Sequence, residues 1–176
     1  MNKNIIIAIV ALAIIVAGAH YFSKKNVQPV VTADGYKNAS YSIDGHSVTL
    51  VQGYAEEEAA PGSASKIVTQ YFGNEAHGDL NGDGKEDIAF LLTQSGAGSG
   101  TFYYAVVALN NGDDTYTGTN AVLLGDRIAP QTTEIHGAQL VVNYADRAPG
   151  EPMTAQPSVG VSKYLKLNGT ELVPVK

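Results

Sequence analysis

Two hydrophobic patterns follow one another along the chain. From Ile5 to Phe22 nearly every residue is apolar, as in a helix that is buried or spans a membrane. After residue 40, short runs rich in valine, tyrosine and threonine alternate with glycine, asparagine and aspartate, which is typical of β-strands joined by tight turns. The patterning predicts an N-terminal helix at residues 1–22, a linker without periodicity at 23–39 and a β-domain at 40–176.

The N-terminal helix is long enough to cross a membrane. Eighteen helical residues span about 27 Å, close to the roughly 30 Å of a hydrocarbon core. The lysines at positions 24 and 25 would stop transfer through the bilayer. We therefore expect a single-pass protein of the cell membrane, tethered by this helix, with its C-terminal domain outside the cytoplasm.

A cleaved signal peptide is the alternative reading of the same segment. Ala17-Gly18-Ala19 has the small-x-small pattern that signal peptidase accepts, with cleavage before His20. The mature protein would then be secreted or periplasmic. The chain has no cysteine, so neither a lipid-modified cysteine nor a disulfide framework is available.

The β-domain shows strong hairpin signals. Asp44-Gly45, Asn111-Gly112 and Asn168-Gly169 each separate two strand-like runs, and such pairs favour the positive φ angles of two-residue turns. The run at 101–110 is apolar on both faces, which predicts a central strand. We expect an all-β fold of about nine strands, an antiparallel sandwich or a partly open barrel.

The charge distribution narrows the range of partners. Eight of the eleven basic residues and all seventeen acidic residues follow residue 25, which leaves that part of the chain with a net charge of −9. Phosphate binding depends on clustered lysine and arginine. The sequence therefore argues against nucleic acid as a partner, and it is compatible with a bound cation.

The segment HGDLNGDGKEDIAF at 77–90 concentrates oxygen-bearing side chains in one turn. Numbered from Asp79, the side chains of Asp79, Asn81, Asp83 and Asp87 fall at positions 1, 3, 5 and 9. Calcium takes six to eight oxygen ligands, and alternate residues of a curled loop can face one ion. This spacing predicts a calcium site, with a polar β-turn that binds no ion as the alternative.

Two further positions of the loop refine the prediction. Gly84 at position 6 permits a sharp turn, and Lys85 at position 7 would contribute its backbone carbonyl while its side chain points to solvent. Position 12 is Phe90, where an EF-hand has a bidentate glutamate, and the following residues predict a strand instead of a helix. The loop is therefore not an EF-hand.

The loop resembles the D-x-[DN]-x-D-G-x-x-D loops of integrin-type FG-GAP repeats and related VCBS repeats, which lead into a β-strand. The resemblance covers about a dozen residues. It implies Asp79, Asn81, Asp83 and Asp87 as side-chain ligands of calcium and Lys85 as a carbonyl ligand.

More loosely, residues 40–176 resemble membrane-anchored or lipoprotein-type β-domains of bacteria that carry one such loop. This resemblance implies a location and a calcium ion, and it implies no activity. The partner of such a domain would be an envelope protein or a polysaccharide.

Two functions remain open from the sequence. The favoured one is a non-enzymatic module in which calcium either stiffens a loop or takes a direct part in binding a partner. The alternative is a hydrolase of envelope polymers that uses a carboxylate pair, Glu57 or Glu58 with Asp146, as acid and base. No complete catalytic constellation supports the second reading in the sequence.

Overall fold

The computed structural model describes residues 34–96 and 98–175, and the predicted membrane segment at 1–22 lies outside these ranges. No helix within the described ranges is long and apolar enough to cross a membrane. The described chain is all-β, and its sheets are antiparallel, as the sequence predicts. The elements in chain order are the 3-10 helix η1 (Gly35–Asn38) and the strands β1 (Ser40–Ile43), β2 (His46–Thr49), β3 (Tyr54–Glu58), β4 (Lys66–Gly78), β5 (Asp87–Ser95), β6 (Thr101–Gly112), β7 (Thr115–Gly118), β8 (Val122–Asp126), β9 (Ala129–His136), β10 (Gln139–Asp146), β11 (Val159–Asn168) and β12 (Glu171–Pro174).

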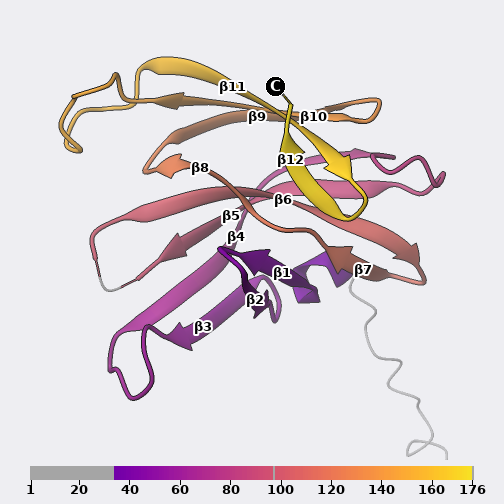
Figure 1. Ribbon diagram of the computed structural model, residues 1–176, viewed down its shortest axis with the longest axis horizontal. Helices are drawn as coiled ribbons and strands as arrows, with labels where there is room; N and C mark the ends of the chain where they lie inside the picture. The colour runs from indigo at the N-terminus through magenta and orange to yellow at the C-terminus, as the bar shows by residue number, and fades with distance from the viewer. Residues whose placement is uncertain (1–33, 97, 176) are drawn as a thin grey trace, which may run out of the picture. The chain divides into compact units, whose positions relative to one another are not determined.

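Three sheets make up the domain (Figure 1). The largest has the order β3-β4-β5-β6-β7, and β8 also pairs with β6. A four-stranded sheet has the order β12-β11-β10-β9, and β1 and β2 form a separate hairpin. Strand β6 thus has β5 along one edge, and along the other it pairs with β8 near its start and with β7 near its end.

The central strands β5 and β6 of the largest sheet are buried on both faces. Successive side chains of a strand point to opposite sides, so the two strands contribute to two cores. On one face, Leu91 and Val107 pack against the four-stranded sheet through Leu140 and Leu165. On the other face, the neighbouring residues of β5 and β6 pack against η1 and the β1–β2 hairpin. This burial confirms the prediction that residues 101–110 form a central strand. The second core contains Tyr36, Tyr41, Ile43, Val48, Leu50, Phe90, Leu92, Tyr104 and Val106.

The folded domain begins earlier than the sequence suggests. Residues 34–39 fall within the expected linker at 23–39, yet Tyr36 is buried, and its ring meets that of Phe90 edge-on at 5.5 Å between centroids. The hydroxyl of Tyr41 donates a hydrogen bond to the carbonyl oxygen of Tyr36 at 2.7 Å. A single turn of 3-10 helix has no hydrophobic periodicity to detect, so one aromatic anchor is its only signal.

Strand β7 passes so close to β1 that one position requires glycine. A Cβ atom built on Gly118 would overlap the carbonyl oxygen of Ser40 and would lie 2.6 Å from the ring of Tyr41. Any side chain at this position would push β7 away from the hairpin.

The part of strand β4 that pairs with β5 contains two more residues than β5. Residues 68–78 of β4 are aligned with residues 87–95 of β5, and the register shifts once on each side of Gly73. Gly73 and Asn74 adopt left-handed φ angles of +103° and +57°. These are two β-bulges, each of which accommodates one additional residue.

Candidate metal centre

The aspartate loop is the connection of the β4–β5 hairpin. Asp87 is the first residue of β5, and it pairs with Gly78 at the end of β4. Between them the chain turns sharply at Gly82 and Gly84, with φ angles of +79° and +82°. The left-handed conformation at Gly84 agrees with the turn expected at the sixth loop position.

The carboxylate of Asp79 organises the turn. Its Oδ1 accepts hydrogen bonds from the backbone amides of Gly82 and Asp83 at 2.7 and 3.1 Å. Its Oδ2 accepts a third from the amide of Gly84 at 2.9 Å. Three consecutive amides are thereby turned towards one side chain, which fixes the curvature of the loop.

The next two predicted ligands continue the pattern. Asn81 Oδ1 accepts from the amide of Asp83, and Asp83 Oδ1 accepts from the amide of Lys85, both at 2.9 Å. The hydrogen bond from the Lys85 amide, aided by the Asn81 side chain and the Lys85 charge, lowers the pKa of Asp83 despite slight desolvation. Asp83 is therefore a carboxylate throughout the physiological pH range.

The Lys85 side chain also makes a contact within the loop. Its ammonium group lies 3.4 Å from Asp83 Oδ2, while 45% of the side chain remains accessible to solvent. Asp83 and Lys85 are only two residues apart in the turn, so the long Lys85 side chain can reach the Asp83 carboxylate.

Asp87 is the buried member of the set. Its side chain is inaccessible to solvent, and its Oδ2 accepts a hydrogen bond from the amide of Leu80 at 3.0 Å. Its Oδ1 accepts from the amide of Asn110 at 2.9 Å. The amide side chain of Asn110 in turn donates to the carbonyl of Glu86 at 3.1 Å. Neither Leu80 nor Asn110 is marked by the sequence pattern.

The structure thus joins the first three predicted ligands in one network and places the fourth at its base. Across residues 34–96 and 98–175, no three histidine, cysteine, aspartate or glutamate side chains are grouped closely enough to hold a metal ion. The donor set itself suits calcium, because all its members offer oxygen. Each bonded side-chain oxygen keeps a second lone pair, except Asp79 Oδ1, which already accepts two hydrogen bonds. Binding would require the carboxylates of Asp79, Asp83 and Asp87 to turn towards one point.

A second network runs from the loop into the core. His77 lies between two carboxylates, with Nδ1 3.2 Å from Glu86 Oε1 and Nε2 3.4 Å from Glu75 Oε2. Glu75 Oε1 accepts hydrogen bonds from the hydroxyls of Tyr36 and Tyr71, each at 2.5 Å. Burial would raise the pKa of Glu75, but the two tyrosine hydroxyls and His77 outweigh it, so that the pKa is lowered.

The carboxylates of the hydrolase alternative occupy different surroundings. Glu57 and Glu58 in β3 line a cavity together with Asp44 and His46. Asp146, the last residue of β10, accepts a hydrogen bond from the amide of the following residue at 2.7 Å and does not line that cavity.

Comparisons of the chain with protein families, with curated proteins and with solved structures found no match.

Proposed function

We propose that the loop at 79–87 binds one calcium ion, and that the chain is a membrane-tethered, extracytoplasmic β-domain whose β4–β5 connection this ion stiffens. The observation that carries the proposal is the hydrogen-bond network of Asp79, Asn81 and Asp83, which aligns three oxygen side chains along one curled loop. The proposed ligands are those three side chains with Asp87 and the carbonyl of Lys85.

The network favours ion binding because it fixes the backbone before an ion arrives. Each amide that bonds to a carboxylate holds that carboxylate near the centre of the turn, which reduces the ordering entropy lost on binding. Calcium tolerates irregular coordination, whereas magnesium demands a near-ideal octahedron. A loop with mixed carboxylate, amide and carbonyl donors therefore suits calcium better than magnesium.

A structural role follows from the position of Asp87. This residue already connects the loop to β6 through the amide of Asn110. An ion shared between Asp87 and the other ligands would extend that connection to the tip of the loop. The loop would then present a fixed surface to an envelope protein or polysaccharide partner.

The location and the finer architecture belong to the same proposal. The apolar run at 1–22 supports a tether or a signal segment, and the acidic domain that follows supports exposure to the calcium-containing side of the membrane. An antiparallel sandwich is the architecture that agrees best with two sheets sharing one core.

The test is thermal unfolding of the full-length chain in non-ionic detergent, in EDTA, in about 1 mM calcium and in about 1 mM magnesium. A site with a Kd of about 10 μM would stabilise the fold by roughly 2.7 kcal/mol in calcium. The midpoint should then rise by about 5 to 11 °C.

Two variants complete this test. Asp83→Ala should abolish the calcium-dependent rise, whereas Glu171→Ala, which removes an exposed carboxylate from β12, should retain it. No rise in calcium, or an equal rise in magnesium, would overturn the proposal and leave a polar turn.

A further inference from the structure

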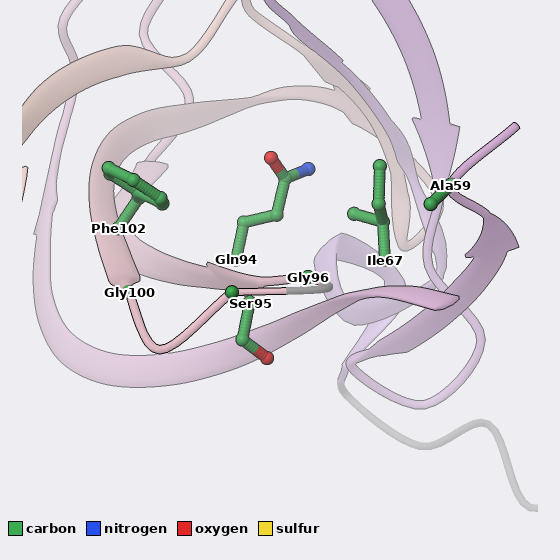
Figure 2. Close-up of a pocket in the computed structure, with 8 residues that line it drawn as sticks. Ala59, Ile67, Gln94, Ser95, Gly96, Gly100 and Phe102 are labelled. Atoms are coloured by element: carbon green, nitrogen blue, oxygen red, sulfur yellow. The ribbon is translucent and has the colours of Figure 1, made fainter. Parts of the chain in front are cut away.

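A groove lies at the opposite end of β5 from the aspartate loop. Two cavities, each of about 290 Å³, share Ala59, Ile67 and Gln94 in their walls and therefore adjoin each other. Figure 2 shows the side chain of Gln94 between Phe102 and Ile67 in one of them. None of the residues of the aspartate loop lines either cavity.

The groove exists because the β1–β2 hairpin covers only part of the sheet face beneath it. Leu92 in β5 and Tyr104 in β6 lie under the hairpin and are almost fully buried. Two residues away in each strand, and on the same face, Gln94 of β5 pairs with Phe102 of β6. The Phe102 side chain is 41% exposed. The sheet therefore extends past its cover and leaves an open floor.

One half of the groove is largely apolar. Ile67 and Phe102 supply its hydrophobic surface, and the Gln94 amide lies between them, donating to Thr69 Oγ1 at 3.2 Å. The glycines at 96, 98 and 100 add backbone to the wall without side chains that would fill the space.

The other half is acidic. Asp44, Glu57 and Glu58 line it with His46, and no lysine or arginine is among its lining residues. The nearest paired cation is Lys66, whose ammonium lies 3.7 Å from Glu58 Oε1, with both side chains more than two-fifths exposed. An exposed pair of this kind is weak, so the groove keeps a negative character.

The positions of these carboxylates are set by the fold. Asp44 occupies the hairpin turn with a φ of +50°, and its Oδ2 accepts a hydrogen bond from the Tyr104 hydroxyl at 3.3 Å. Burial, together with the charge of Asp44, raises the pKa of Tyr104 to about 12, so this hydroxyl remains a donor. Glu58 Oε2 accepts from the amide of Gly62 at 2.9 Å.

We propose that this groove binds a small organic cation with an apolar stem, the chemistry of an alkyl polyamine. The ammonium groups would lie by Asp44 and by Glu57, whose partner across the strands is Ile67, and the methylene chain would lie on Ile67 and Phe102. Cavities of this size are at the lower end of those that hold small molecules, which favours a slender ligand. A neutral ligand would leave the carboxylates without a countercharge in a partly enclosed site.

Calorimetric titration of the full-length chain with spermidine tests this proposal. The protein is kept in non-ionic detergent with EDTA, so that the aspartate loop holds no calcium and failure of one proposal is distinguishable from failure of the other. We expect saturable binding, a weaker interaction at higher ionic strength, and no comparable heat from the neutral sugar maltotriose.

Matched variants locate the site. The double substitution Asp44→Asn with Glu57→Gln should weaken spermidine binding at least about tenfold, and Phe102→Ala should weaken it by about threefold or more. Glu171→Gln removes one carboxylate from the four-stranded sheet and should leave the affinity unchanged; circular dichroism checks that each variant is folded. Absence of binding, tighter binding of maltotriose, or an equal loss in Glu171→Gln would overturn the proposal.

Discussion

The buried carboxylate of Asp87 accepts a hydrogen bond from the backbone amide of Asn110 at 2.9 Å, which ties the start of β5 to β6 from within the domain. Its other oxygen accepts from Leu80 at 3.0 Å. One side chain thus satisfies a backbone donor in the loop and another in the central strand. The base of the loop is therefore fastened whether or not an ion occupies the turn.

Replacing Asp87 by asparagine should destabilise the protein even without calcium. The asparagine amide presents one oxygen and one NH2 group, so one of the two backbone amides would face a donor instead of an acceptor. A buried donor without its partner costs about 1 to 3 kcal/mol. Urea unfolding in EDTA measures the loss, and Asp113→Asn in an exposed turn should change stability by less than about 0.5 kcal/mol. An unchanged midpoint for Asp87→Asn would contradict the bracing role.

Replacing Lys85 by methionine should strengthen calcium binding. The ammonium lies 3.4 Å from Asp83 Oδ2, where it would repel an incoming ion, and the backbone carbonyl is unaffected by the change. We expect the Kd to fall roughly three- to tenfold at low ionic strength, with a smaller difference at high salt. Calcium titration by calorimetry measures this, with Lys166→Met in β11 as the control. Weaker binding by Lys85→Met would show that the ammonium supports the loop.

The pH dependence of stability should reflect Glu75. Its folded-state pKa is lowered from the ordinary value of 4.5, with the hydrogen bonds of Tyr36 and Tyr71 and the nearby His77 outweighing burial. The resulting stabilisation is fully present above pH 4.5 and is lost as pH falls through the lower folded-state pKa. In Glu75→Gln this part of the acid dependence should disappear, and Tyr71→Phe should reduce it. The measurement is the urea midpoint of each protein between about pH 2.5 and 6. If the midpoint falls equally steeply with pH in the wild type and in Glu75→Gln, Glu75 is not the group responsible.

Replacing Gly118 by alanine should loosen the contact between β7 and β1. The new methyl group would overlap the carbonyl oxygen of Ser40 and crowd the ring of Tyr41. Overpacking of this kind typically costs about 1 to 3 kcal/mol. The matched control is Gly160→Ala in β11, where a Cβ atom meets nothing within 4 Å. Equal urea midpoints for the two variants would mean that the strands separate at no cost.

The features that the sequence predicts correctly are local ones. Asp44-Gly45 joins β1 and β2, as its turn chemistry indicates. A hairpin also forms where Asn168-Gly169 predicts one, with Gly169 and Thr170 as the two residues between the paired Asn168 and Glu171. The double-sided burial of β6 follows from its uninterrupted apolar run. These signals are contained within a few consecutive residues, so no knowledge of distant contacts is needed.

The features that the sequence does not predict depend on distant partners. Strands β7 and β8 are separated at residues 119–121, where the carbonyl oxygen of Thr119 and the amide of Ala121 form hydrogen bonds with Ser42 of β1. In the aspartate loop, the spacing of the proposed ligands is visible in the sequence. The hydrogen bond between Asp87 and Asn110 is not, because it joins residues 23 positions apart. Nothing near either residue marks that contact.

The paired bulges of β4 limit how this hairpin can change in length. Side chains alternate between the two faces with a period of two, so a gain or loss of one residue turns every later side chain to the opposite face. Two additional residues restore the alternation, and Ala76 accordingly still faces the core beyond the bulges. An insertion or deletion near Gly73 that no bulge absorbs must therefore contain an even number of residues to preserve the core.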